Sequence, residues 1–509
     1  MNNSTYSSVD NENFEDFLQS CVPYKPPEDI IKAVTPWKKA MKRVIWGLAL
    51  STLLLNLFCL NYILPAIGII LSTLGLRVLR NENRWFRIYY TVTLIHAVYA
   101  LYVFIINTTV TLQSLIPGVV FTAANIIFAF AKLTLFCLSL YETEKKSGIH
   151  PRKGPMIALI IWYTLLVFLG LISFSGYVLP SLMIIGFVCI IISLNKISKE
   201  IDEVGYSIES ASVKISDKVL ATAFVAVVVT GMACGYIFAG GYPMHWEVKK
   251  ENEHAQVQQV KEHLLSLGFP EDILEDMTAE DILACENATK VVGNTSTVPF
   301  NKGRVERTVT KYPNYIYTYT ETVYDIKEMT VTGIGICLTE ESEGDGDWLI
   351  IHHFCWDINP GFYGTECIQI YPAYQNQHTN SFSYVAEPTG RVLYSKDGVD
   401  YVSAYHSLGS EQYTSENIVL GEKTNTEIFA TFSMPDKAER QRGYVMYAVA
   451  DNSEHSSVIG STLTYNHQES FLQYPVETAK NNVKTDLFSH SPAFIKQQSG
   501  LQIADRELM

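Results

Sequence analysis

The stretch VIWGLALSTLLLNLFCLNYILPAIGIILSTLGLRVL, residues 44–79, decides how the chain is arranged. It is apolar almost throughout, and it is longer than the roughly 17–25 residues that one helix needs to cross a bilayer. Asn61 and Pro65 offer a turn and a helix start within it. If the stretch crosses the membrane twice, the chain has seven spans in total. If it crosses once as a kinked helix, every later segment lies on the opposite side of the membrane.

Charge decides between these two interpretations. Further apolar runs bring the expected membrane-spanning helices to seven, over residues 44–60, 62–78, 88–107, 113–139, 156–173, 177–195 and 218–240. Lys and Arg cluster before the first span and then in every second loop, whereas the loops near 60–62, 108–112 and 174–176 contain none. Cytoplasmic loops carry the excess of Lys and Arg. The alternation therefore requires two crossings in 44–79, a cytoplasmic N-terminus and an extracytoplasmic C-terminal region.

Composition divides the chain at the same place. Residues 1–240 carry 19 Lys and Arg against 14 Asp and Glu, while residues 241–509 carry 19 against 38. A nucleic acid or an anionic lipid surface requires a basic partner. We therefore expect no nucleic-acid partner. The expected partners are the lipid bilayer for the first part and a protein or glycan ligand for the acidic second part.

Five parts follow from these patterns. We expect a cytoplasmic tail (1–43), the seven-span bundle (44–240), a helical neck (241–292), a β-sandwich (293–475) and an irregular tail (476–509). The polar first 43 residues lack the short apolar core of a cleavable signal, so the first span is expected to direct insertion. Localisation in the cell membrane follows.

The neck and the β region differ in hydrophobic period. Val257, Val260 and Leu264 have helical spacing, Gly268 suits a helix end, and the tetrapeptide EDIL occurs at 271–274 and again at 280–283. Thr278 with Asp281 predicts a variant capping box. From about residue 293 the period changes to two, which predicts many short strands. The expected fold of this region is an all-β sandwich resembling a jelly roll.

Within the β region, LIIHHFCWDINPGFYGTEC (349–367) resembles a reactive site in composition. If EGDGDW (343–348) and DINPGFYG (357–364) are turns, three strands form a meander. Three cysteines then lie in one row across neighbouring strands: Cys337, Cys355 and Cys367. Opposed residues in such strands have Cα atoms about 4.5–5.5 Å apart, a separation that permits a disulfide.

Several interpretations of this row stay open. One is a disulfide between two of the three cysteines, and another is three free, half-buried thiols. A third is a metal site formed by His353, Cys355 and Asp357, although no CxxC pair supports it. Alternation places His352 on the core face and His353 on the opposite face, so the two histidines do not act together. No cofactor is expected.

Two ionisable side chains lie inside the apolar runs, His96 and Lys132. A charge within a membrane indicates function by default, because leaving it unpaired is costly. The structural alternatives are that Lys132 extends its amine to the cytoplasmic interface and that His96 bonds, uncharged, to a neighbouring hydroxyl. The apolar runs contain no Asp or Glu, which weakens a transporter interpretation.

The sequence carries no Gly-x-Ser-x-Gly, Walker, His-Glu-x-x-His or dinucleotide pattern. Whether the chain is an enzyme stays open, with the balance against it. The leading expectation is a multi-pass protein that displays a β-sandwich for ligand binding, sensing or envelope assembly. The alternatives are a membrane-bound enzyme that acts on an envelope substrate and a transporter or channel component.

One resemblance can be stated. NYILPAIGIILSTLGLRVLRNENRWFRIYY (61–90), together with LGFPEDIL (267–274), resembles segments of uncharacterised multi-pass membrane proteins of Gram-positive bacteria. The resemblance implies a bacterial membrane protein. It implies no activity, and no site residue is carried over from it.

Overall fold

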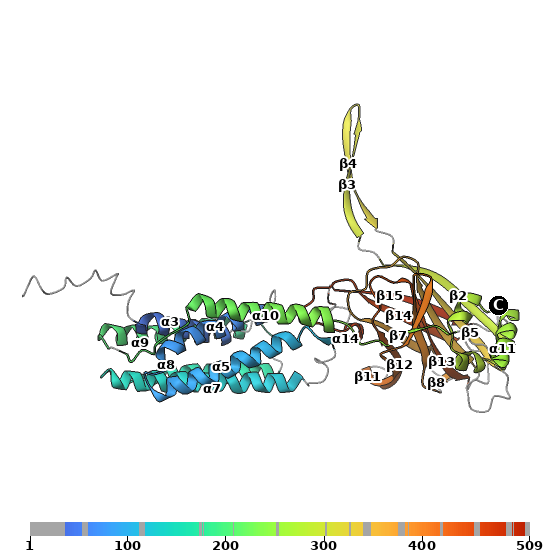
Figure 1. The fold of residues 1–509 in the computed structure, drawn as a ribbon. Coiled ribbons are helices and arrows are strands. Elements are labelled where there is room, and N and C mark those ends of the chain that lie inside the picture. The colour runs from blue at the N-terminus through green and yellow to red at the C-terminus, as the bar shows by residue number, and fades with distance from the viewer. Residues whose placement is uncertain are drawn as a thin grey trace, which may run out of the picture. The chain divides into compact units, whose positions relative to one another are not determined.

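The computed structural model describes most of the chain in two compact units (Figure 1). The described residues are 36–52, 60–110, 118–172, 176, 178–206, 208–250, 254–300, 303–324, 327–338, 348–374, 382–384, 386–417, 421–451, 459–484, 491 and 493–503. One unit comprises Met1–Ile105 with Ile116–Met232, and the other comprises Ile106–Leu115 with Ala233–Met509. The first is helical and the second is mainly β, and they are described separately below.

The helical unit consists of long apolar helices. Among the described residues, six helices are long and apolar enough to cross a membrane: α4 (Leu60–Leu79), α5 (Arg84–Ile106), α7 (Gly118–Lys146), α8 (Lys153–Leu171), α9 (Val178–Glu203) and α10 (Asp217–Ala239). Many of their large apolar side chains are exposed to the surroundings, as lipid-facing side chains are. The chain is therefore a membrane protein with a β domain.

The apolar stretch 44–79 does contain two helices. α3 (Pro36–Thr52) precedes α4 and packs antiparallel to it, with Gly47 beside Gly68 and Ala40 beside Gly75. A Cβ atom added to Gly75 would lie 2.5 Å from the Ala40 carbonyl oxygen, so only glycine permits this approach. α3 begins at Pro36 rather than near Val44, where the first span was expected. Residues 53–59 lie outside the described part, so a seventh crossing stays a prediction.

The four basic stretches of the sequence meet at one end of this unit. The Asp217 carboxylate accepts from Arg43 at 2.6 Å and also from Arg77. Three further ion pairs join the same stretches: Lys38 with Asp202, Arg152 with Glu200 and Lys146 with Glu82. Segments that alternate along the sequence are therefore brought together in space.

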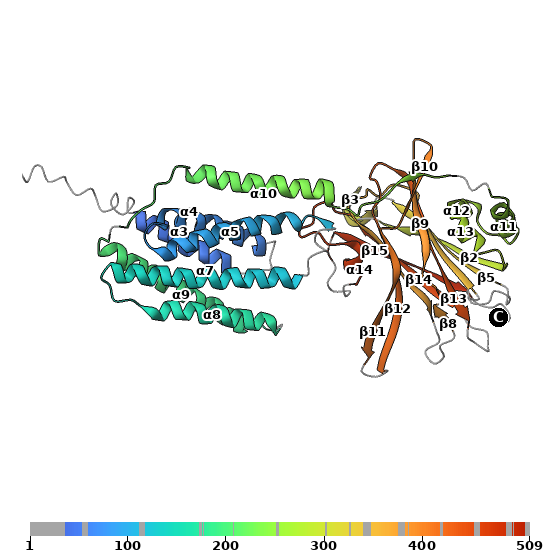
Figure 2. The ribbon, with the colours of Figure 1, turned by 60° about the horizontal axis from the view of Figure 1, so that its bottom comes forward.

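The β unit contains two large antiparallel sheets (Figure 2). The larger sheet has the order β1-β10-β9-β13-β6-β5-β2, with β8 also paired to β13. Its strands are β1 (Glu247–Val248), β2 (Ala288–Pro299), β5 (Glu328–Leu338), β6 (Trp348–Trp356), β8 (Phe382–Tyr384), β9 (Thr389–Lys396), β10 (Val399–Ala404) and β13 (Glu439–Asp451).

The second sheet has five strands in the order β11-β12-β7-β14-β15. They are β7 (Glu366–Tyr374), β11 (Ser407–Asn417), β12 (Gly421–Phe432), β14 (Ile459–Gln468) and β15 (Phe494–Ile503). A core that includes Phe354, Trp356, Ile370, Phe432 and Tyr465 draws on both sheets. The two sheets therefore pack face to face, as the sequence predicted. The finer jelly-roll topology stays a prediction.

Helices cover the outer faces of both sheets. α11 (Ala255–Ser266), α12 (Glu271–Asp276) and α13 (Ala279–Leu283) pack their apolar sides on the larger sheet, where Ile336, Ile351 and Met446 complete the cluster. α14 (Ala479–Lys484) packs on the smaller sheet beside Cys367 and Phe429. Figures 1 and 2 show α11 and α14 at opposite ends of the β domain.

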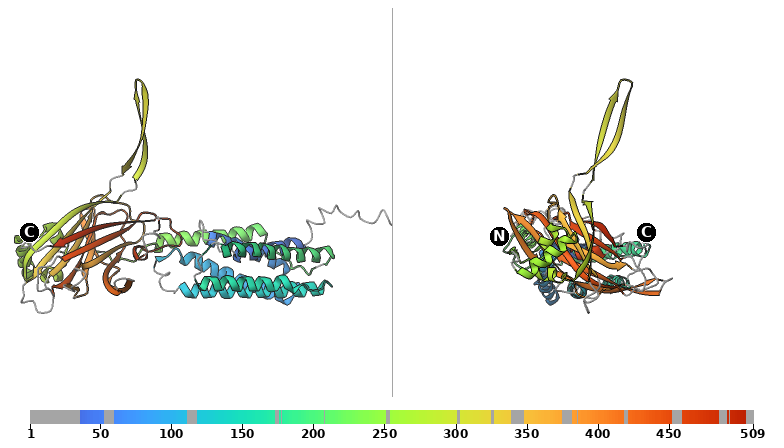
Figure 3. Two further views of the ribbon diagram at one scale, coloured as in Figure 1. Left: turned by 180° about the vertical axis from the view of Figure 1, so that it is seen from behind. Right: turned by 90° about the vertical axis from the view of Figure 1, so that its right-hand side faces the viewer.

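Two expectations about the β region were wrong. Residues 494–503, which were expected to be irregular, form the edge strand β15, because Leu501 is buried in the core and β14 supplies hydrogen-bond partners along its length. Residues 303–324, which were expected in the sandwich, form a separate ribbon of β3 (Gly303–Tyr312) and β4 (Tyr315–Tyr324) (Figure 3). Among the described strands, β3 and β4 pair only with each other.

The close approach of α3 and α4 makes a testable prediction. Gly75→Ala should destabilise the full chain by on the order of 1–3 kcal/mol, because its new methyl group meets backbone and the helices must separate. Gly186→Ala in α9 is the matched control, since a Cβ atom there meets nothing within 4 Å. Thermal unfolding of the purified chain in detergent, followed by circular dichroism, measures both. Equal midpoints for the two variants would contradict the packing described.

Candidate functional site

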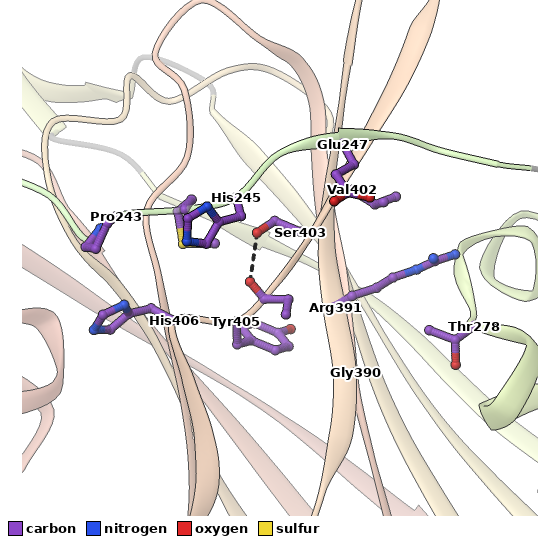
Figure 4. Close-up of a pocket in the computed structure, with 12 residues that line it drawn as sticks. Pro243, His245, Glu247, Thr278, Gly390, Arg391, Val402, Ser403, Tyr405 and His406 are labelled. Atoms are coloured by element: carbon purple, nitrogen blue, oxygen red, sulfur yellow. Dashed lines mark hydrogen bonds between the residues drawn. The ribbon is translucent and has the colours of Figure 1, made fainter.

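A cavity of about 660 Å³ opens beside the edge of the larger sheet (Figure 4). Four parts of the β unit line it: the chain leading into β1, the neck between α12 and α13, the start of β9, and the end of β10 with the residues that follow it. The lining residues are Pro243, Met244, His245, Glu247, Thr278, Gly390, Arg391, Val402, Ser403, Ala404, Tyr405 and His406. Pro243 follows the last residue of α10, Ala239, by four positions, so the chain itself holds the cavity within about 15 Å of that helix end.

The cavity exists because strand pairing stops early. β1 pairs with β10 only at Glu247 and Val248, so the residues before them diverge from the end of β10 and leave a gap. Gly390 forms part of the opposite wall with a φ of +146°. A Cβ atom there would lie 2.1 Å from the Tyr444 carbonyl oxygen, so the close crossing of β9 over β13 requires glycine.

The polar groups of the cavity suit binding better than covalent catalysis. His245 lies exposed on the segment before β1 and Glu247 lies exposed at the start of β1, while the His406 ring stacks on Tyr242 with centroids 4.4 Å apart. The Ser403 hydroxyl donates to the Ala404 carbonyl oxygen at 2.9 Å rather than to a histidine (Figure 4). Nucleophilic catalysis by serine requires a base that accepts the hydroxyl proton. The cavity thus offers donors, acceptors and a flat aromatic face.

A buried ionic network lies next to the cavity and joins the neck to the sheet. Arg442 of β13 donates through Nε to both carboxylate oxygens of Asp276, at 3.0 and 2.8 Å, and through Nη2 to Asp400 at 2.8 Å. His353 Nε2 lies 3.1 Å from Asp276 Oδ2. Arg391, from the cavity wall, donates to the main-chain carbonyls of Asp276 and Met277, so its charge faces the C-terminal end of α12.

This network controls the ionisation of Asp276. Burial alone would raise the pKa of its carboxyl group, but the hydrogen bond from His353 and the charge of Arg442 more than offset burial. The Asp276 pKa therefore lies below its ordinary value of 3.8, and the group is charged at neutral pH. Asp276 is a structural anion with satisfied partners rather than a proton donor.

Asp281, the aspartate of the second EDIL copy, also joins the neck to the sheet. The Thr278 side chain accepts from the Asp281 backbone N–H at 3.1 Å, which is one half of the predicted capping box. In the other half, the Thr278 N–H donates to the Tyr444 hydroxyl rather than to the Asp281 carboxylate. That carboxylate accepts from Tyr444 and from Thr389 instead. Tyr444 of the sheet thus replaces the Asp281 carboxylate in the N-cap of α13.

The predicted cysteine row was wrong. β5 pairs with β6 so that Cys337 faces Trp348 and Cys355 faces Thr330, whereas Cys367 lies in β7 of the other sheet. Because the larger sheet is buried on both faces, alternating apolar residues do not specify its register. All three thiols are free. Burial raises the pKa of Cys355 to about 11 and that of Cys367 to about 12, so neither is a ready nucleophile.

The two adjacent histidines do point to opposite faces, as predicted. His353 contacts Asp276 on the neck side. His352 lies between the sheets, 2.7 Å from the Ser461 hydroxyl, and burial lowers its pKa to about 4. Both members of this serine–histidine contact are almost fully buried, so no substrate reaches it. In the described part of the chain, no three His, Cys, Asp or Glu side chains form a metal-binding group, and His353, Cys355 and Asp357 do not converge.

The intramembrane residues His96 and Lys132 contact each other. Lys132 Nζ lies 3.2 Å from His96 Nδ1, and both side chains are buried near the middle of α7 and α5, respectively. Lys132 therefore does not extend to the interface, and His96 bonds to an amine rather than to a hydroxyl. The Thr93 hydroxyl, one turn from His96, is fully buried and has no hydrogen-bond partner among the residues that the structure describes.

Comparison with known proteins adds little. No family model and no curated protein matches the sequence. A solved structure described as "AvmM Catalyzes Macrocyclization in Alchivemycin A Biosynthesis" is similar over 39% of this chain and 97% of that chain, with 10% identity and a TM-score of 0.18. A TM-score this low establishes neither a shared fold nor a shared activity.

Sequence reasoning missed the residues of both the cavity and the network. Asp276 and Arg442 are 166 positions apart, and the cavity residues come from separate strands. The repeated EDIL tetrapeptide was the available signal, since each copy lies close to an aspartate that holds the neck on the sheet.

The network predicts a large effect of a small substitution. Asp276→Asn should destabilise the β domain by about 3–5 kcal/mol, because Arg442 then loses its fully buried counter-charge and keeps only the partly exposed Asp400. Glu411→Gln is the matched control, since Glu411 pairs with Lys480 and Lys484 at the surface and should cost less than about 1 kcal/mol. Urea unfolding of the full chain in detergent, followed by near-ultraviolet circular dichroism, measures both.

The difference in stability between the natural chain and Asp276→Asn should depend on pH in a defined way. The lowered Asp276 pKa contributes stability that is fully present above pH 3.8 and is lost as the pH falls through the folded-state value. The stability gap between the natural chain and Asp276→Asn should therefore stay constant near neutral pH and shrink below pH 3.8. A gap that closes between pH 5 and 7 would show that another group controls the network.

Proposed function

We propose that this chain is a membrane-anchored receptor whose β domain binds a small polar ligand outside the cytoplasm. The observation that carries the proposal is the cavity beside Pro243–Glu247, a segment that continues into α10 within a few residues. A ligand seated there contacts both the sheet and the segment that leaves the membrane. Ligand binding can thus change the strain on α10, as sensing requires.

The charge distribution supports the proposed sidedness. The basic stretches that meet at one end of the helical unit mark the cytoplasmic side, because cytoplasmic loops retain Lys and Arg. Residues Ile106–Leu115, which follow α5, belong to the same compact unit as Ala233–Met509, which includes the end of α10. Four long apolar helices separate these two points, and an even number of crossings returns the chain to one side.

Seven crossings are the simplest topology consistent with this sidedness. The antiparallel pair of α3 and α4 begins and ends with the ion pairs of Arg43 and Arg77 to Asp217. A chain that leaves the basic end and returns to it crosses twice. The N-terminus is then cytoplasmic and the β domain is extracytoplasmic.

The chemistry of the cavity favours a ligand about the size of a sugar. Ligand pockets of about 300–1,000 Å³ are typical for small molecules, and this cavity lies within that range. The imidazoles of His245 and His406 and the carboxylate of Glu247 supply hydrogen-bond donors and acceptors. The His406 ring, which stacks on Tyr242 outside the lining, supplies a flat face. A glycan or a cell-wall fragment from the envelope matches these features.

A thermal-shift screen of the full chain in detergent against glycans and peptidoglycan fragments tests this proposal. A ligand at 100 times its Kd stabilises the folded state by about 2.7 kcal/mol, which is about 5–10 °C for a domain of this size. Ala404→Trp should abolish the shift by filling the cavity, whereas Ser266→Trp on the exposed side of α11 should retain it. A shift that survives Ala404→Trp would place the ligand elsewhere, and the absence of any shift would count against the receptor.

One observation favours a second candidate, the passage of protons or small anions through the bundle. Lys132 and His96 bring an amine and an imidazole together near the middle of two apolar helices, where ionisable groups usually mark a transport path. The receptor remains the first candidate, because the described membrane helices contribute no carboxylate to this pair.

Proteoliposomes loaded with a pH-sensitive dye test the second candidate. If the pair conducts, Lys132→Met should abolish dissipation of a pH gradient, whereas Lys145→Met at the exposed end of α7 should leave it unchanged. No dissipation by the natural chain would eliminate the candidate. The pair would then be structural, and replacement of Lys132 by an apolar side chain should leave stability unchanged or raise it.

A further inference from the structure

The loop SFLQYP, residues 470–475, presents two large apolar side chains to the surroundings. It joins β14 to α14 in the smaller sheet. Phe471 is 44% exposed and Leu472 is 75% exposed. Large apolar side chains that are adjacent and exposed indicate a contact surface.

This loop is bonded to the ends of two membrane helices. The Tyr236 hydroxyl, in the last turn of α10, donates to the Gln473 carbonyl oxygen, and the Tyr236 ring lies 5.8 Å from that of Phe471. The Val476 N–H donates to the carbonyl oxygen of Asn107, the first residue after α5, at 2.8 Å. All of these residues belong to one compact unit, Ile106–Leu115 with Ala233–Met509.

The position of these helix ends identifies what covers the loop. A spanning helix ends at the bilayer interface, where aromatic side chains such as tyrosine gather. Phe238, two residues after Tyr236, is 82% exposed and lies in the apolar helix α10, so lipid is its natural environment. Phe471 and Leu472 extend this apolar surface from the helix onto the β domain.

We propose that the loop 470–475 inserts Phe471 and Leu472 into the outer interface of the bilayer and holds the β domain against the membrane. Lipid, rather than a second copy or another protein, is the occupant. A stable protein interface buries about 1,200–2,000 Å², far more than two side chains provide. Insertion of side chains that are already tethered at the interface needs no such area. The proposal depends on the membrane crossings and not on the ligand cavity.

A cavity of mixed polar and apolar lining, formed in part by the loop itself, is consistent with a lipid neighbour. It measures about 760 Å³, and its lining combines apolar residues such as Leu472, Pro475 and Val476 with polar ones such as Gln473, Glu477 and Asn481. The apolar side chains thus face the acyl region while hydrogen-bonding groups lie beside them. This is the order of chemistry found across a bilayer interface, where headgroups lie next to acyl chains.

Photocrosslinking of the full chain in lipid nanodiscs tests the proposal. p-Benzoylphenylalanine in place of Leu472 should form lipid adducts, as should the same residue in place of Phe238. In place of Leu265 on α11, which is 40% exposed at the opposite end of the β domain, it should form about tenfold fewer or none. Mass spectrometry of the irradiated protein counts the adducts.

Each outcome decides the matter. Adducts at 238 and 472 but not at 265 support insertion. Adducts at 238 alone, or equal adducts at 472 and 265, overturn it. Hydrogen exchange gives a second test without the bulky probe: Leu472→Asp should speed amide exchange in residues 470–477 in nanodiscs, and Leu265→Asp should not. Unchanged exchange in Leu472→Asp would also contradict the proposal.

Discussion

The ion pairs of the Asp217 carboxylate are the interactions on which the proposed membrane arrangement of the chain depends. The carboxylate accepts from Arg43 at the start of the helical unit and from Arg77 at the end of α4. It thereby ties three separate stretches of chain to one end of the bundle. Because Lys and Arg mark the cytoplasmic side, this end sets the proposed side of every other segment. The ligand cavity and the loop at 470–475 both take their proposed location from it.

The β domain is organised by burial of its larger sheet on both faces. One face packs on the smaller sheet and the other packs on the neck helices. The neck helices are therefore part of the β domain. The neck carries acidic side chains into that contact, and Asp276 is compensated by Arg442 and His353. A helical module docked in this way supplies Thr278 to the cavity wall, so the network that stabilises the domain also shapes its proposed binding site.

Much of the fold could be predicted from local pattern, because apolar length and loop charge act over short distances. The long helices, the neck helices and the opposite directions of His352 and His353 followed from such patterns. Strand order did not, because β6 pairs with β13, about 90 positions away, and β7 belongs to the other sheet. The predicted register of β5 with β6 was also wrong, because Cys337 lies opposite Trp348 rather than Cys355, and both faces of this sheet are buried. The cavity is lined by segments that are far apart in the sequence, so no local pattern could predict it.

The sidedness of the β domain is the central claim, and labelling with a membrane-impermeant maleimide tests it most directly. Ser266→Cys lies on the exposed side of α11, and Ser212→Cys lies in the exposed segment between α9 and α10. In intact cells, Ser266→Cys should label above the background of the parent chain. Ser212→Cys should label only after the membrane is permeabilised. Labelling of Ser212→Cys in intact cells, with Ser266→Cys protected, would show that the β domain faces the cytoplasm and would contradict the account.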